Sequence, residues 1–182
     1  MKVLIVVDMQ NDFVTGVLST PEAQTIVPNV VSKIEEYRKN RNPVILTRDT
    51  HFSEFFKESV EGKKLPMHCA VNSDGWDFVE EIRELAIAYD FESIEKEYFV
   101  NSYELHDALH FYEDDELEAV ELVGLFTDIC VLSHAIISQE ALPYVPIIVD
   151  ASCCAGSTPE AHKKALELMR DSLLIDVVNF EE

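Results

Sequence analysis

Cys130 is placed where a thiol can act as a nucleophile. The largely apolar run Ala119–Leu125 predicts a buried strand, and a helical pattern begins at Cys130. A thiol in the first turn of a helix, at the carboxyl end of a strand, meets backbone N–H groups and the positive end of the helix dipole. Both of these favour a thiolate. The sequence therefore indicates covalent chemistry at Cys130, with a buried packing cysteine as the structural alternative.

Two further charged residues follow predicted strands and complete a candidate triad. Asp8 comes directly after the apolar strand Val3–Val7 and can take the thiol proton as a general base. Asp12 either competes for this role or caps the turn. Lys96 ends the predicted strand Ser93–Lys96 and would stabilise both anions. A carboxylate that orients a turn and a solvated surface lysine are the structural alternatives.

A second group of residues has the side chains of a metal site. Asp49 and His51 follow the predicted strand Pro43–Thr47, and because one residue separates them, both can reach one ion from an extended segment. With Glu61 and His68 they would offer imidazoles and carboxylates, a set that suits Zn²⁺, Mn²⁺ or Fe²⁺. Scattered polar loop residues are the alternative. The histidines in helical patterns, interpreted as surface or structural residues, are His110, His134 and His162.

Alternating strand and helix patterns supply the scaffold that must position these residues. They predict an α/β fold with a mostly parallel, doubly wound sheet of about six strands flanked by helices, in a single domain over residues 1–182. Such a sheet binds ligands beyond the carboxyl ends of its strands, where the candidate triad and metal ligands would converge. The remaining predicted strands are Val145–Val149 and Leu173–Val178, and the predicted helices are Val27–Lys39, Phe78–Ala86, Leu105–Phe111, Cys130–Ala141 and Pro159–Met169.

The composition argues against several partners and locations. The 35 acidic and 14 basic residues give a net charge of −21, so we expect no binding to nucleic acid or to a membrane. No apolar run reaches the roughly 18 residues of a membrane span, and the apolar start is too short for a signal peptide. The four cysteines match no secreted disulfide scaffold, which predicts a reduced, cytoplasmic protein with Cys153 and Cys154 as packing residues. The oligomeric state stays open, a homo-oligomer included.

Four motifs, in order along nearly the whole chain, resemble those of the isochorismatase-like cysteine hydrolases. They are Val6–Phe13, Thr47–His51, Lys96 and Gly124–Val131. Within that superfamily, Asp-x-His at Asp49–His51 and Pro-x-His-Cys at Pro66–Cys69 are similar to the nicotinamidase and pyrazinamidase branch.

The resemblance implies a role for each matching residue. Asp8, Lys96 and Cys130 would form the catalytic triad. A cis peptide bond would join Leu125 to Phe126, and the N–H groups of Phe126 and Cys130 would form an oxyanion hole.

The resemblance also implies one divalent metal ion, with zinc ahead of manganese or iron. Asp49, His51 and His68 would bind it, and Glu61 matches the fourth ligand, with Glu54 and Glu58 as alternatives. The ion would coordinate the ring nitrogen of the substrate and position the ring.

Three residues match positions that line the substrate pocket in the family. They are Phe13, Leu65 and Tyr103. At Leu65, members of the family commonly carry an aromatic residue that stacks on the substrate ring, so this position leaves the exact substrate open.

The activity implied is hydrolysis of a small-molecule amide, nicotinamide and also pyrazinamide, through a cysteine thioester in NAD salvage. A hydrolase of another small amide or ureido compound is the alternative within the superfamily. A catalytically silent binding module conflicts with the intact triad. A nucleotide-binding protein conflicts with the lack of a Gly-rich phosphate loop.

Overall fold

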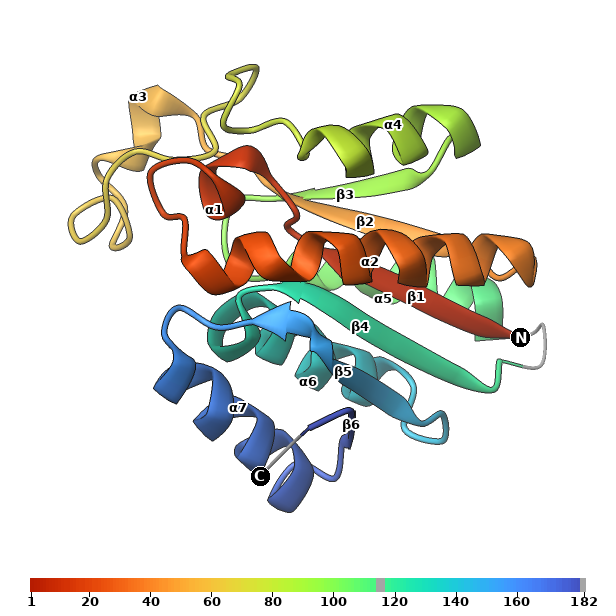
Figure 1. Cartoon of the computed structure of the whole chain (residues 1–182). Coiled ribbons are helices and arrows are strands. Elements are labelled where there is room, and N and C mark those ends of the chain that lie inside the picture. The colour runs from red at the N-terminus through yellow and green to blue at the C-terminus, as the bar shows by residue number, and fades with distance from the viewer. Residues whose placement is uncertain (114–116, 181–182) are drawn as a thin grey trace.

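A six-stranded sheet forms the centre of the molecule. The computed structural model describes residues 1–113 and 117–180. All neighbouring strands are parallel, in the order β3-β2-β1-β4-β5-β6 (Figure 1), which confirms the predicted doubly wound sheet. The strands are β1 Lys2–Val7, β2 Val44–Asp49, β3 Glu92–Lys96, β4 Ala119–Leu125, β5 Ile147–Ala155 and β6 Asp176–Val178.

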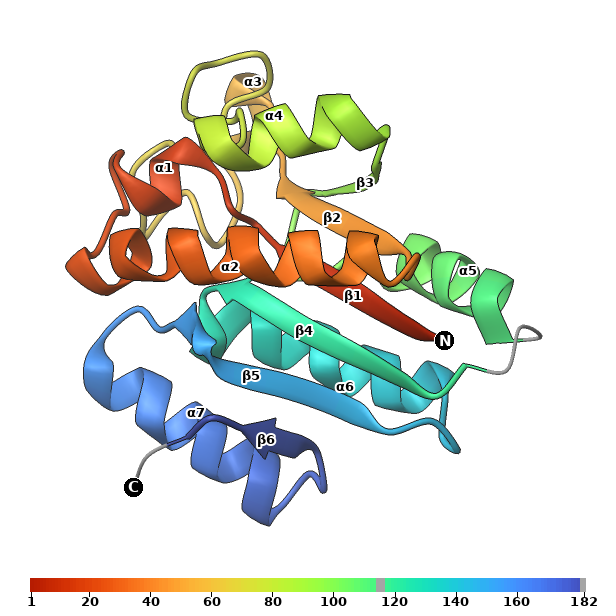
Figure 2. The ribbon, with the colours of Figure 1, turned by 45° about the vertical axis from the view of Figure 1, so that its right-hand side comes forward.

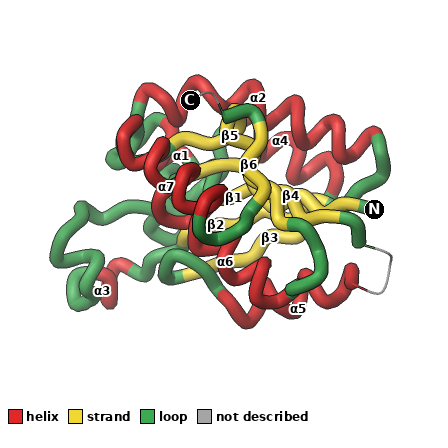
Figure 3. The backbone as a smooth tube through the Cα atoms, turned by 90° about the horizontal axis from the view of Figure 1, so that it is seen from below, coloured by secondary structure: helices red, strands yellow, loops and turns green. Residues whose placement is uncertain are grey.

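Helices cover both faces of the sheet (Figures 2 and 3). Val3, Ile5 and Val7 belong to the core under one group of helices, and Leu4 and Val6 to the core under the other, which explains why β1 is apolar throughout. None of the helices in the described residues is long and apolar enough to cross a membrane. One face carries α1 Asn11–Val14, α2 Pro21–Lys39 and α4 Glu80–Tyr89, and the other carries α5 Ser102–Glu113, α6 Leu132–Ala141 and α7 Pro159–Asp171.

Two differences from the predicted elements have local causes. The fifth strand continues past Val149, because β5 resumes its pairing with β4 after a register shift and takes Cys153 and Cys154 into the sheet. Both thiols are buried there. The last strand shrinks to β6, because the N–H of Leu173 still bonds to Leu168 O, a carbonyl of α7.

The site begins where β1 and β4 end side by side. Gly124 in β4 has a φ of +116°, and a Cβ built on it would lie 2.1 Å from the carbonyl oxygen of Val7. Only glycine allows this approach of the two backbones. Asp8, the residue after Val7, has a φ of +50°, in the left-handed region that aspartate tolerates better than most residues. The strand order reverses between β1 and β4, which is where doubly wound sheets form their ligand crevice.

A buried ion cluster fixes α2 to the sheet. Lys33 Nζ lies 2.7 Å from Glu121 Oε1 on β4 and 2.8 Å from Asp150 Oδ2 on β5. Tyr37 donates a hydrogen bond to Glu121 Oε2 at 2.6 Å. Burial raises the pKa of the Asp150 carboxyl, but hydrogen bonds from Lys33 and Asn179 outweigh it and lower the pKa below its usual value. Asp150 therefore stabilises the fold in its charged form.

We expect Lys33→Met to destabilise the protein because it leaves two carboxylates without their shared cation. The loss near pH 7 should be on the order of 2 kcal/mol, below the roughly 3–5 kcal/mol of a fully buried pair because the Lys33 side chain is 17% exposed. Since the folded pKa of Asp150 is depressed, its contribution is present above about pH 4 and is lost at lower pH. Urea unfolding should therefore show the difference from wild type shrinking toward about pH 3.

Lys163→Met is the matched control, since Lys163 is exposed and lies 3.8 Å from Glu167 in a surface ion pair. It should change stability by less than about 1 kcal/mol. Equal effects of the two substitutions would contradict the role given to Lys33.

Candidate active site

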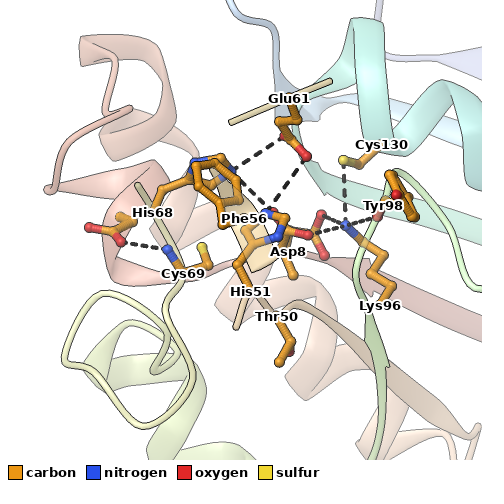
Figure 4. A network of polar contacts seen from close by, with 12 residues as sticks. Asp8, Thr50, His51, Phe56, Glu61, His68, Cys69, Lys96, Tyr98 and Cys130 are labelled. Atoms are coloured by element: carbon orange, nitrogen blue, oxygen red, sulfur yellow. Dashed lines mark hydrogen bonds and ion pairs between the residues drawn. The ribbon is translucent and has the colours of Figure 1, made fainter. Parts of the chain in front are cut away.

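Lys96 lies at the centre of the site, and its ammonium group contacts both groups of predicted residues (Figure 4). Its Nζ is 2.8 Å from Asp8 Oδ2, 3.4 Å from Asp49 Oδ1 and 3.6 Å from Cys130 Sγ. It also donates a hydrogen bond to Tyr98 O at 3.0 Å. Burial lowers the pKa of Lys96, but the surrounding anionic groups outweigh burial and raise the pKa well above its usual value. The side chain is therefore a fixed cation.

Asp8 is fully buried at the carboxyl end of β1. Its Oδ1 accepts a hydrogen bond from Thr47 Oγ1 at 2.7 Å, and its backbone N–H bonds to Thr47 O at 3.3 Å. Its Oδ2 faces Lys96. Burial raises the pKa of Asp8 above its usual value, against the lowering effect of Lys96. A raised pKa suits a carboxylate that accepts a proton and later returns it.

Cys130 lies in η1 Thr127–Val131, a π-helical turn between β4 and α6. Its side chain is buried beside Lys96. Burial raises the pKa of the thiol well above its usual value, although Lys96 lowers it, and the carboxylates of Asp8 and Asp49 add to the rise. This direction is opposite to the thiolate that the helix start predicted, because burial has the largest effect on the thiol. The thiol holds its proton and requires a base.

The predicted metal ligands lie together on the other side of Lys96. His51 Nε2 and His68 Nε2 are 3.1 Å and 3.4 Å from Asp49 Oδ2, and Glu61 lies 3.8 Å from His51 and 3.5 Å from His68. One donor atom from each of the four residues falls within 4.8 Å of all the others. Two imidazoles and two carboxylates at this spacing can hold a divalent metal ion.

The charges of the cluster fit a cation. Burial raises the pKa of Asp49, but Lys96 and the two imidazoles outweigh it and hold the pKa far below the usual range. Burial lowers the pKa of His68, whereas hydrogen bonds to Asp49 and Glu61 raise it to about 10. These carboxylates thus favour positive charge at the position of His68. Of the glutamates considered, Glu61 belongs to the cluster, while Glu54 and Glu58 are exposed.

Two polar residues, the buried Gln10 and the half-buried Asp12, place the ligands. Gln10 clamps Asp49: its Nε2 donates to Asp49 O at 2.8 Å and its Oε1 accepts from Asp49 N–H at 2.7 Å. Asp12 Oδ2 accepts from the N–H of Cys69 at 2.7 Å and so anchors the segment that carries His68. The side chain of Asp12 therefore holds the segment of the metal cluster. This role is closer to capping a turn than to acting as a competing base for the thiol.

A cavity of about 580 Å³ opens over the triad and the metal cluster. Phe13 and Phe126 form its inner wall, with ring centroids 5.4 Å apart in an edge-to-face arrangement. Cys130, Lys96, Asp49 and His68 lie on its floor, and Leu65 lies at its mouth. The peptide bond between Leu125 and Phe126 is cis, as the resemblance implied.

The structure corrects one predicted pocket residue. Tyr103 is absent from the cavity lining: it lies 76% exposed in the first turn of α5 and borders a separate open groove with Glu95. The segment between β3 and α5 turns Tyr98 and Phe99 toward the cavity instead. An aromatic pair that begins two residues after Lys96 was the available signal for them.

Two polar residues near the nucleophile, Ser157 and Asp128, were given no role in the sequence analysis. Ser157 lines the cavity, and its N–H and Oγ each donate to the carboxylate of Asp128 at 2.7 Å. His134 is buried, with Nδ1 2.7 Å from Cys130 O, and burial lowers its pKa to about 3. It is structural, as expected, yet it supports the nucleophile's turn. No sequence pattern distinguishes these roles.

The chain matches the isochorismatase domain model over residues 2–181. A nicotinamidase of Saccharomyces cerevisiae is 24% identical, over 93% of this chain and 96% of the relative. The solved pyrazinamidase/nicotinamidase of Streptococcus mutans superposes with a TM-score of 0.86 at 24% identity, covering 98% and 100% of the two chains. The pyrazinamidase of Pyrococcus horikoshii, solved in complex with zinc, gives a TM-score of 0.80 at 28% identity, covering 98% and 99%.

We expect the purified protein to bind one divalent metal ion per chain and His68→Ala to lose it. The substitution removes an imidazole that Asp49 and Glu61 both face. Metal content after dialysis against zinc, measured by plasma mass spectrometry, checks this. His110→Ala is the control, because His110 is exposed on α5 and pairs with Glu113. Equal metal content in the two variants would rule out the cluster as the metal site.

Asp12→Ala should weaken metal binding without removing a ligand. The Cys69 N–H loses its acceptor, so the segment that carries His68 is less well held. Loss of an outer-shell partner typically costs about 10- to 100-fold in metal affinity. Competition against a fluorescent zinc chelator measures this, with Asp74→Ala, an exposed carboxylate of the same loop, as the control. An unchanged dissociation constant in Asp12→Ala would contradict the positioning role.

Proposed function

The chain belongs to the isochorismatase family, and from this premise we propose that it is a nicotinamidase, which hydrolyses nicotinamide to nicotinate and ammonia. The observation that carries the proposal is the position of Lys96, whose ammonium contacts the Asp8 and Cys130 side chains and the metal-type ligand Asp49 at once. A nucleophile and a metal cluster that share one lysine suit a substrate with a reactive amide and a ring nitrogen. Nicotinamide and pyrazinamide both have these groups.

The acylation half of the reaction uses the triad. Asp8 takes the proton of Cys130, and the sulfur attacks the amide carbonyl carbon, so that a C–S bond forms and the carbonyl oxygen becomes an oxyanion. The backbone N–H groups of Phe126 and Cys130 would stabilise that oxyanion, a contribution of about 3–4 kcal/mol per donor in other acyl-transfer enzymes. Asp8 then gives its proton to the amide nitrogen, the C–N bond breaks and ammonia leaves.

The deacylation half reverses the proton transfers. Asp8 takes a proton from an attacking water, whose oxygen bonds to the thioester carbon. The C–S bond breaks, nicotinate is released and the sulfur regains its proton. Throughout, Lys96 offsets the negative charge that passes between Asp8 and Cys130, because its raised pKa keeps it charged.

Four residues would hold the metal ion: Asp49, His51, Glu61 and His68. Zinc is the ion we propose first, and when bound it would supply a Lewis acid for the ring nitrogen of the substrate. Phe13 and Phe126 would flank the ring, and positioning of this kind can contribute several powers of ten in effective concentration.

We expect Cys130→Ala to lower kcat for ammonia release from nicotinamide by at least about 1,000-fold, since removal of a nucleophile leaves only binding and oxyanion stabilisation. A coupled glutamate dehydrogenase assay measures the ammonia. Cys153→Ala is the matched control, because Cys153 is a buried thiol of β5 that lies outside the cavity. It should keep wild-type activity.

Two other results would change the proposal. Full activity of Cys130→Ala would end the nucleophile assignment. Turnover of another small amide or ureido compound, with nicotinamide inert, would favour the alternative hydrolase. Leu65 at the cavity mouth is the residue that keeps this alternative open.

A further inference from the structure

The cavity has two zones of different character. The inner zone is buried and contains Lys96 and Cys130 of the triad and the aromatic pair Phe13 and Phe126. The outer zone is a ring of apolar side chains at the mouth, which we call the outer apolar ring. It consists of Leu18, Val60, Leu65, Tyr98 and Phe99.

The side chains of the outer apolar ring are exposed to water, and a bound ligand would cover them. Val60 is 71% exposed, Leu65 40%, and Tyr98 and Phe99 are exposed by more than half. The side chains come from three segments that lie far apart in the sequence, yet all border one cavity. Apolar side chains gathered at one opening are typical of a binding site. Their contact with water is unfavourable, and a bound apolar group removes that contact.

Nicotinamide would leave the outer apolar ring uncovered. Lys96 Nζ lies 3.6 Å from Cys130 Sγ and 3.4 Å from Asp49 Oδ1, so one lysine headgroup separates the nucleophile from the metal cluster. A single pyridine ring with its carboxamide would be held between these two anchors, in the inner zone. The whole cavity, about 580 Å³, falls in the range of roughly 300–1,000 Å³ that is typical of sites for much larger ligands.

The direction and chemistry of the remaining space can be stated. With the carboxamide at Cys130 and the ring nitrogen at the metal cluster, the ring carbon farthest from both anchors is the one that lies meta to each. A substituent there would point away from the floor of the cavity. Lys64 is the cation at the mouth, beside Glu61, and the rest of the outer lining is largely apolar. The space therefore suits an uncharged apolar group.

We propose that the substrates of this enzyme are pyridine carboxamides that carry an apolar substituent meta to both the ring nitrogen and the carboxamide, and that the outer apolar ring binds this substituent. The inference rests on the proposed amidase activity. It assigns the outer apolar ring to substrate selection, and it makes nicotinamide itself the minimal substrate rather than the best one.

The test compares nicotinamide with 5-phenylnicotinamide in the metal-loaded enzyme. We expect kcat/KM to be at least about tenfold higher for the phenyl compound, since a group the size of one methylene already contributes about 10- to 200-fold in an apolar pocket. Calorimetric titration of Cys130→Ala with both compounds gives a second readout, and the phenyl compound should bind at least about tenfold more tightly.

Val60→Asp should abolish the preference by placing a charge in the outer apolar ring. Val60 is largely exposed, so the substitution carries little risk to folding. Ile87→Asp is the matched control: Ile87 is 76% exposed on α4 and outside the cavity, and its substitution should leave the ratio of the two kcat/KM values unchanged. Leu65→Asp is a second variant of the ring and should act as Val60→Asp does.

Three results would overturn the inference, and they differ from one another. If nicotinamide is hydrolysed and the phenyl compound is equal or poorer, the outer apolar ring does not select substrate, while the proposed function stands. If the enzyme prefers the phenyl compound but the preference survives in both Val60→Asp and Leu65→Asp, the outer apolar ring is not its cause. If neither pyridine carboxamide is hydrolysed, the proposed function fails and the inference fails with it.

Discussion

The ion pair between Lys96 and Asp8 is the interaction on which the rest of the site depends. Both groups are buried, so each would be costly without the other, and their charges balance only because the Nζ–Oδ2 distance is 2.8 Å. The same ammonium faces Asp49 and Cys130. One lysine thus places its positive charge beside a carboxylate of the triad and a carboxylate of the metal cluster, in a chain whose net charge of −21 would otherwise make a buried anionic pocket unfavourable.

The strand order of the sheet places the two residues of that ion pair close together. Asp8, Asp49 and Lys96 each stand at the carboxyl end of a strand, and β3, β2 and β1 are consecutive neighbours in the sheet. Register brings Asp49 opposite Lys96. Cys130 enters from β4 across the topological switch point, where Gly124 lets β4 pass closely beside Val7. Strand pairing therefore sets the positions of Asp8 and Lys96, and the turn η1 after β4 places Cys130 beside them.

How much the sequence predicts follows from this arrangement. Residues directly after a buried strand are easy to find, because a short apolar run reveals the strand and its end. This is why Asp8, directly after β1, and Lys96, at the end of β3, could be predicted, while Cys130 was predicted from the start of the helical pattern after β4. Tyr98 and Phe99 could not be separated from Tyr103, since the path of an irregular segment depends on packing that no local pattern records. The Lys33 cluster was also not predicted. Glu121 is a single charged residue in an otherwise apolar strand, and no local pattern shows that Lys33 lies beside it.

The pKa of the Cys130 thiol shows why the triad needs all three members. A helix start alone would favour a thiolate, but burial raises the pKa of this thiol, so the nucleophile needs a base. Burial also raises the pKa of Asp8, and a raised pKa makes its carboxylate a stronger base for the thiol proton. Without Lys96, both groups would bind protons more tightly and neither would act. Burial raises the pKa of both Asp8 and Cys130, and the nearby charge of Lys96 opposes that rise in each of them.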